Sequence, residues 1–153
     1  MRTCSRAEAI LWSIAFPGFG QLLNGRYIKG LLLVALEFVI NDQARLNQLI
    51  MNSFHGDITR AIADTDYQWL LFYPCIYMFA IWDAYRDAGG GQSPYAVVPV
   101  VFGAYFGTIG VIYSSNWAGA MFLGLAGMLV GLGVGQVIKW LLTRRSLGDL
   151  TRS

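Results

Sequence analysis

The chain has 153 residues, of which 56% are hydrophobic and 13% are charged, whereas about 25% of the residues of an average soluble domain are charged. Its net charge is only +2, and its 11 Lys and Arg residues form no basic block. These properties argue against a nucleic-acid partner and favour one integral membrane domain, residues 1–153, with the lipid bilayer as its surroundings.

The first apolar run, within residues 7–26, is interrupted near its middle. Proline removes a backbone donor and glycine frees the backbone dihedrals, so a straight helix is not expected to pass through the interruption. A polar turn follows it. We predict that residues 7–26 form a re-entrant or interfacial helical segment. The residues that define the break and the turn are Pro17, Gly18, Gly20, Gln21, Asn24 and Gly25.

Four later runs are candidates for crossing a membrane. A helix needs about 20 apolar residues to cross a hydrocarbon core of roughly 30 Å. The last two runs meet this length easily. The first of the four runs spans the bilayer only if its helix continues into the polar stretch after it, and the second is slightly short but is flanked by aromatic residues. We therefore expect an all-α membrane protein with four transmembrane helices. The expected helices are residues 27–41, 67–84, 95–113 and 117–142.

The positions of the basic residues predict an orientation. If the first segment does not cross, Arg45 and Arg60 are the only members of the 11 Lys and Arg residues on the far side. Basic loops stay cytoplasmic. We therefore expect a multi-pass protein of a bacterial cell membrane, with both termini in the cytoplasm.

Residues 42–66 are then an extracytoplasmic segment. Their apolar residues recur at three- and four-residue spacing, which predicts an amphipathic helix, and Gly56 is expected to interrupt it. The apolar stripe of this helix has three possible neighbours: the lipid surface, a partner protein, or the protein's own helices.

Glycines at four-residue spacing mark the last two apolar runs. Small residues at this spacing flatten a helix face and let two backbones approach closely. The two glycine faces could meet each other, meet another membrane protein, or line a pore. The packing glycines are Gly103, Gly107, Gly127, Gly131 and Gly135.

Glu37 is the one carboxylate well inside an apolar run. A charge at the centre of a membrane helix costs about 2.5–3.5 kcal/mol, so this group needs a partner, water or a proton. Arg45 follows on the same helix face, and Tyr73 or Tyr77 of the next run is a possible partner. Both a proton or ion site and a neutral or paired structural glutamate fit this pattern.

Asp83 and Arg86 stand at the end of the third apolar run. An acid near a helix C-terminus opposes the helix dipole and needs a compensating cation. We predict an ion pair of Asp83 with Arg86, Arg26 or Lys29, of which the last two would tie the first segment to the third run. Two aspartates without a nearby histidine are a thin ligand set, so no metal site is expected.

The apolar runs contain no Ser–His, Cys–His or paired-acid arrangement, and the chain contains no phosphate-binding loop. We therefore expect no catalytic residue, no cofactor and no enzymatic activity. The leading hypothesis is an accessory or scaffold subunit of a membrane complex or homo-oligomer. The alternative is a small transporter or channel that uses the broken first segment and Glu37. A third, weaker hypothesis is an intramembrane enzyme using Asp83 and Asp87.

The stretch that reads Pro-Gly-Phe-Gly-Gln-Leu-Leu-Asn-Gly from position 17, followed by Lys29-Gly30, resembles the opening of TM2-domain-like small bacterial membrane proteins. The Trp-Asp pair at the end of the third run looks like the end of the second helix in that family. The resemblance covers just over half of the chain and implies a small membrane protein, without implying an activity. The matching residues are Pro17, Gly18, Gly20, Gln21, Gly25, Gly30, Trp82 and Asp83.

Overall fold

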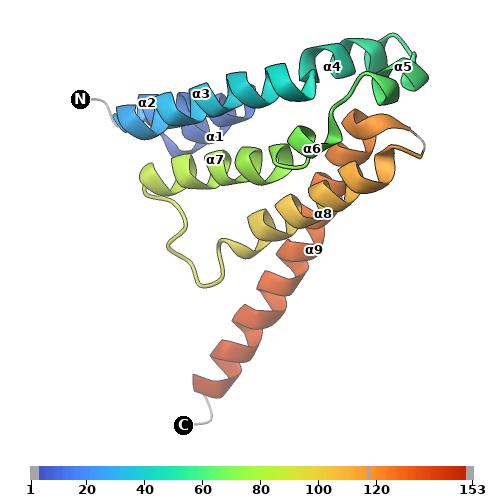
Figure 1. The fold of residues 1–153 in the computed structure, drawn as a ribbon. Helices are drawn as coiled ribbons and strands as arrows, with labels where there is room; N and C mark the ends of the chain where they lie inside the picture. The colour runs from blue at the N-terminus through green and yellow to red at the C-terminus, as the bar shows by residue number, and fades with distance from the viewer. Residues whose placement is uncertain (1–3, 117, 151–153) are drawn as a thin grey trace.

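The fold is described by a computed structural model over residues 4–116 and 118–150, with side chains described up to residue 146. All the regular structure in these residues is helical, as the sequence predicts (Figure 1). The helices in chain order are α1 (Arg6–Ala15), α2 (Phe19–Leu23), α3 (Tyr27–Ala44), α4 (Leu46–Phe54), α5 (Ile58–Ala63), α6 (Tyr67–Leu70), α7 (Tyr73–Asp87), α8 (Val98–Ser114) and α9 (Gly119–Leu150).

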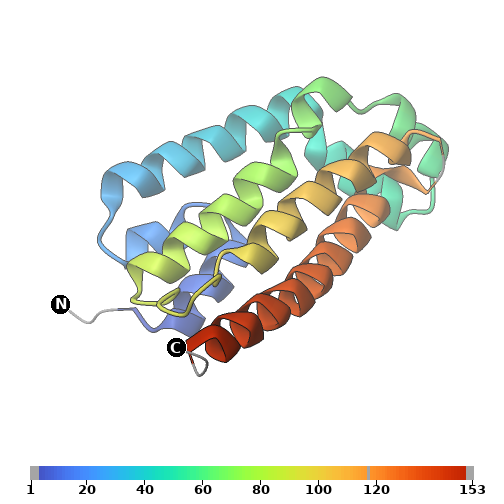
Figure 2. The ribbon, with the colours of Figure 1, turned by 90° about the horizontal axis from the view of Figure 1, so that it is seen from below.

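In the view of Figure 2, the axes of the long helices α3, α7, α8 and α9 lie along one direction of the molecule and the chain alternates between them, whereas Figure 1 shows α9 inclined to α3 and α7. Helices α4 and α5 lie at one end of this bundle and contact α9. The start of α1 and the end of α9 lie toward the opposite end. The main cluster of buried apolar side chains lies near α4 and α5 and comprises Ile40, Ala44, Leu46, Leu49, Ala61, Leu70, Val111 and Ala120.

The expectation of four transmembrane helices is wrong. Within the described residues, one helical stretch is long and apolar enough to cross a membrane, Gly119–Ser146 of α9. It has 28 residues, and the mean hydropathy of its most apolar 18 residues is 2.0. Helix α8 is apolar but has only 17 residues. Helix α3 has 18 residues but includes the charged residues Lys29, Glu37 and Asp42.

Proline explains why two of the expected spans have different bounds. The expected helix 67–84 is divided into α6 and α7, because Pro74 has no N–H group to donate to the carbonyl of Leu70. Pro74 stands instead in the first turn of α7, where no such bond is needed. Pro99 likewise stands in the first turn of α8. Trp117, at which the last expected span begins, lies outside the described residues.

Helix α9 differs from the core helix of a globular domain. Only 22% of its most apolar stretch is buried within the protein. Its outward-facing side chains include Leu129, Val130 and Val137, all of which are more than half exposed. Burial of apolar surface stabilises a protein in water, so a helix with this much exposed apolar surface is suited to lipid or to another protein.

The interruption predicted near Pro17 is present. Helix α1 ends at Ala15, and Gly18 has a φ of 102°, which allows the chain to reverse into α2. Helices α1 and α2 therefore form a short helical hairpin that contacts α3 and α7. As predicted, no single straight helix passes through residues 7–26.

Residues 42–66 are helical and amphipathic. The break predicted at Gly56 lies between α4 and α5, where Gly56 has a φ of 79°. Leu49 and Ala61 are buried in the core cluster, whereas Met51 and Phe54 are exposed. Of the three possible neighbours of the apolar stripe, the structure shows the protein's own helices.

The two glycine faces meet each other. A Cβ atom placed on Gly127 or Gly131 would overlap the backbone carbonyl of α8 residue Phe106 or Phe102, respectively. On Gly135, it would lie 2.5 Å from the Cα atom of Pro99. Gly107 and Gly103 face α9 side chains as well as α7. These glycines pack within the α8–α9 hairpin.

Candidate functional site

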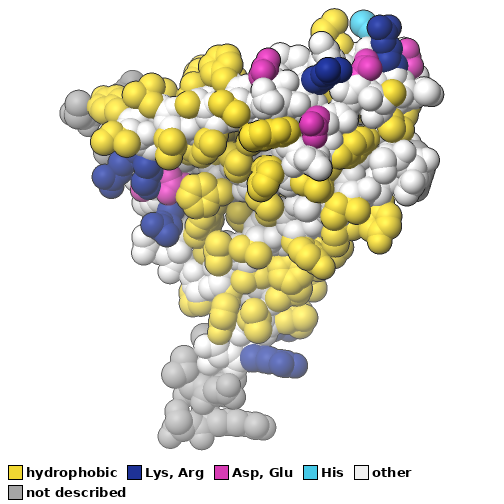
Figure 3. Space-filling view, viewed as in Figure 1, with side chains coloured by type: hydrophobic (Ala, Val, Ile, Leu, Met, Phe, Trp, Pro, Cys, Tyr) yellow, Lys and Arg dark blue, Asp and Glu magenta, His cyan; other side chains and the backbone are white. Residues whose placement is uncertain are grey.

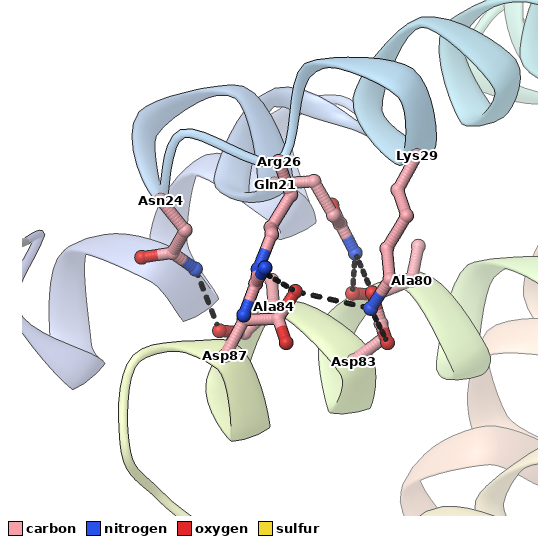
Figure 4. Close-up of polar contacts among 8 residues, drawn as sticks. All are labelled: Gln21, Asn24, Arg26, Lys29, Ala80, Asp83, Ala84 and Asp87. Atoms are coloured by element: carbon pink, nitrogen blue, oxygen red, sulfur yellow. Dashed lines mark hydrogen bonds and ion pairs between the residues drawn. The ribbon is translucent and has the colours of Figure 1, made fainter.

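A polar network connects the α2–α3 region to the second half of α7 (Figure 4). We call it the α7 polar network. Its side chains come from segments about sixty residues apart in sequence. It comprises Gln21, Asn24, Arg26, Lys29, Asp83 and Asp87, together with the carbonyl groups of Ala80 and Ala84.

The amide side chains of this network hold α2 against α7. Gln21 is fully buried, and its Nε2 atom donates to the carbonyl oxygen of Ala80 at 2.8 Å and to Asp83 Oδ2 at 3.2 Å. One helical turn further, Asn24 Nδ2 donates to the carbonyl oxygen of Ala84 at 2.8 Å. Each carbonyl has two lone pairs and can accept this bond in addition to its helical one.

Two cations balance two aspartates on one face of α7. Lys29 Nζ lies 2.8 Å from Asp83 Oδ1 and 3.1 Å from Asp87 Oδ2, and Arg26 Nε lies 3.6 Å from the same Asp87 oxygen. The predicted ion pair of Asp83 is therefore made by Lys29. The hydrogen bond to Asp83 raises the pKa of the Lys29 ammonium, partial burial opposes this, and Asp87 adds to the rise.

The raised pKa of Lys29 predicts a dependence of stability on alkaline pH. The stabilising contribution is complete below the ordinary lysine pKa of 10.5 and is lost as the pH rises through the higher pKa of the folded state. We expect the difference in unfolding midpoint between the wild type and Lys29→Met to be constant from about pH 7 to 10 and to shrink above that range. Thermal unfolding in a mild detergent measures it. A difference that grows with alkaline pH would contradict the assignment.

Gly18 and Gly20 allow the close packing on which the network depends. A Cβ atom on Gly20 would lie 2.6 Å from the carbonyl oxygen of Ala9 in α1 and 2.7 Å from the Cβ atom of Ala84 in α7. One on Gly18 would lie 2.6 Å from the carbonyl oxygen of Gly30. Helix α2 therefore fits between α1, α3 and α7 only with glycine at these positions.

Gly18 and Gly25 offer a matched pair of substitutions. Both have a positive φ, but a Cβ atom on Gly25 would meet nothing within 4 Å. Gly25→Ala should cost only the backbone strain, about 1–2 kcal/mol. Gly18→Ala adds overpacking and should lower the free energy of unfolding by at least about 1 kcal/mol more. Equal losses in a denaturant titration would show that α2 and α3 do not approach as described.

Glu37 lies away from this network, at a cavity near the end of α1. Its side chain is buried, and Tyr73 donates a hydrogen bond of 3.3 Å to its Oε1 atom. This confirms one of the predicted partners. The other, Arg45, does not pair with Glu37 among the ion pairs of the described residues, because α3 ends at Ala44 and the chain turns at Arg45 with a φ of 55°.

The structure brings most of the residues that the sequence singled out to the contact between α2 and α7, and the exceptions are Arg86 and Glu37. Gln21 and Asn24 contact α7 near Asp83, and the glycines around them provide the space. Arg86 is exposed and is not a member of the network. Glu37 shares the cavity with Pro17.

Asp87 is a network residue that the sequence did not single out as an ion-pair partner. The expected helix ended at residue 84, whereas α7 continues to Asp87, and this extension places Asp83 and Asp87, four residues apart, on one helix face. Within the described residues, no group of three or more His, Cys, Asp or Glu side chains is arranged to hold a metal ion. The contacts of the network join the α2–α3 region to α7.

Comparisons with known protein families, with characterised proteins and with solved structures find no match to this chain.

Proposed function

We propose that the protein is a non-enzymatic, membrane-associated scaffold or accessory subunit that packs against another membrane protein or a second copy of itself. The observation that carries the proposal is the apolar exterior of the helical body (Figure 3). Hydrophobic side chains dominate the face drawn there, and Lys and Arg side chains gather toward its edges. The most exposed apolar residues of α3 and α9 include Ile28, Leu31, Leu32, Phe38, Leu129, Val130 and Val137.

The surface is too apolar for a protein surrounded by water alone. Soluble monomers rarely expose a contiguous apolar patch larger than a few hundred Å². Here exposed apolar side chains extend along several helices, and α9 is long and apolar enough to cross a membrane. We propose that lipid covers part of this surface and that a partner protein covers the rest.

We also propose that the protein is multi-pass with both termini on the cytoplasmic side, which requires that shorter helices packed beside α9 return the chain across the bilayer. The start of α1 and the end of α9 point toward the same end of the molecule, and Arg26, Lys29 and Arg144 belong to segments near that end. Arg45 and Arg60 lie in the α4–α5 region at the other end. This distribution follows the rule that basic segments remain cytoplasmic. Arg2 and Arg152, which are among the basic residues expected on the cytoplasmic side, lie outside the described residues.

A relation to the TM2-domain-like proteins is a further part of the proposal. Five of the matching residues meet in one place: Gly18 packs on Gly30, Gly20 packs on α7, and Gln21 binds Asp83. The transporter hypothesis is less well supported, since Gln21 and Asn24 donate to α7 carbonyl groups instead of facing an open path.

The membrane part of the proposal is tested by one substitution and its control. Leu129→Arg places a charge near the middle of the apolar stretch of α9, where Leu129 is 69% exposed. At the centre of a membrane helix this should cost about 2.5–3.5 kcal/mol and reduce the fraction of the protein that resists alkaline carbonate extraction. Met51→Arg, at an exposed position of α4, should leave that fraction unchanged. Release of the wild type by carbonate would refute membrane insertion.

The scaffold part requires a separate measurement. The mass of the full chain in native-lipid particles should correspond to an oligomer or to a complex of fixed stoichiometry. A population of bare monomers that resists carbonate extraction would refute the scaffold while leaving membrane association intact.

A further inference from the structure

A partly enclosed cavity of about 200 Å³ lies where the end of α1 meets α3, α4, α7 and α9. Its walls are mainly apolar and include Leu49, Met121 and Met128. An apolar cavity of about 150 Å³ is large enough to bind benzene. The space here therefore accommodates a small molecule with about one ring.

Glu37 is the one charged side chain among the described residues that line this cavity. It is only 5% exposed. Its Oε1 atom accepts a hydrogen bond from Tyr73, whereas its buried Oε2 atom has no hydrogen-bond partner. Either protonation state leaves Oε2 unsatisfied, because a carboxylate oxygen there lacks a donor and a carboxylic acid lacks an acceptor. An unsatisfied buried polar atom costs about 1–3 kcal/mol, and more when it is charged.

Two aromatic rings add an attraction for positive charge. Tyr73 and Tyr77 line the same cavity, and their rings stack with centroids 5.6 Å apart. The hydroxyl group of Tyr77 donates to the carbonyl oxygen of Ile14 at 2.7 Å, which holds this ring in place. The face of a tyrosine ring attracts a cation. A positive donor in the cavity would meet both the carboxylate and an aromatic wall.

The cavity is accessible from the exterior. Ile14 of α1 and Leu125 of α9 line it, and about half of each side chain is exposed. Both residues belong to the apolar exterior of the molecule, so a ligand with an apolar body can reach the cavity from that side.

We propose that this cavity binds a small organic ammonium ion, which donates an N–H group to Glu37 Oε2 and places its apolar body among Leu49, Met121 and Met128. The ligand is a free amine rather than the headgroup of a phosphatidylethanolamine, because that headgroup would bring a phosphate close to Glu37 and the two negative charges repel each other. This binding site is independent of the scaffold function proposed above.

The test uses the full chain in phosphatidylcholine nanodiscs, which contain no primary amine. Benzylamine is the probe, and toluene is the matched neutral molecule. The methyl signals of isotope-labelled methionine report the site, because Met121 and Met128 line the cavity while exposed Met51 on α4 serves as an internal control. We expect benzylamine to shift the Met121 and Met128 signals and to bind at least tenfold more tightly than toluene.

Glu37→Gln keeps the size of the side chain and an oxygen that accepts the Tyr73 hydrogen bond. Benzylamine should bind this variant at least tenfold more weakly, with toluene unchanged. Equal binding of benzylamine to both proteins, or no shift of Met121 and Met128 in the wild type, would overturn the proposal. If the variant does not fold, the wild-type preference for benzylamine over toluene decides the question.

Two competing ligands separate the remaining possibilities. Acetophenone offers an acceptor instead of a donor, and tighter binding of acetophenone than of benzylamine would show that Glu37 acts as a proton donor and would overturn the proposal. Phosphatidylethanolamine added to the nanodiscs should not displace benzylamine. Displacement would assign the cavity to a lipid headgroup and would also overturn the proposal of a free amine.

Discussion

Gly131→Leu should separate α8 from α9 and lower the free energy of unfolding by more than about 3 kcal/mol, at the upper end of the range for overpacked cores. Even a single Cβ atom at Gly131 would overlap the carbonyl of Phe102 and lie 2.8 Å from the Cα atom of Gly103. Backbone atoms cannot move aside as a flexible side chain can, so the whole hairpin must open. A denaturant titration in a mild detergent measures the loss.

Gly133→Leu is the matched control. Gly133 belongs to the same helix, and a Cβ atom there would meet nothing within 4 Å. Leucine is also a better helix former than glycine, by about 0.5–1 kcal/mol. We expect Gly133→Leu to be neutral or slightly stabilising. If both variants lose the same free energy, the glycine face of α9 does not pack on α8.

Lys29→Met should lower the free energy of unfolding by about 2–3 kcal/mol, less than the loss of a fully buried partner because Lys29 is half exposed. The loss arises because the Asp83 side chain, which is only 8% exposed, is left without its nearest cation. Asp87, with a side chain that is 10% exposed, retains Arg26. Thermal or denaturant unfolding of the two proteins in the same detergent gives the difference.

The exposed ion pair of Arg60 and Asp64 provides the control. Their nitrogen–oxygen distance is 3.6 Å, and the side chains are 70% and 38% exposed. Arg60→Met should cost at most about 0.5 kcal/mol. The double variant Lys29→Met with Asp83→Asn should recover part of the loss, because it removes the unpaired charge. A cost for Lys29→Met no larger than that for Arg60→Met would mean that the α7 polar network does not stabilise the fold.

Local chemistry makes several features predictable from the sequence. The break after Ala15 follows from Pro17 and Gly18, and the break between α4 and α5 follows from Gly56. The acids at the end of α7 required a cation by electrostatics alone, and Lys29 was among three candidates. These conclusions depend on residues that are adjacent or share one helix face.

The number of membrane-crossing helices was not predictable by counting apolar residues. An apolar run of sufficient composition can still be divided by one residue, as Pro74 divides α6 from α7. A run can also include a charge that is paired elsewhere in the fold, as Lys29 of α3 is paired with Asp83 of α7. Composition gives the average hydropathy of a segment, whereas crossing a membrane requires an unbroken helix.

The sequence by itself determined the all-helical class, the hairpin break near Pro17 and the need for small residues on α8 and α9, because helix period, proline and glycine act locally. Only the tertiary structure decided which partners these residues have. It pairs Lys29 with both Asp83 and Asp87, directs the glycine faces toward each other, and leaves Glu37 Oε2 unpaired at a cavity. The physical reason is that these contacts join residues tens of positions apart, and the way the helices pack sets which of them meet.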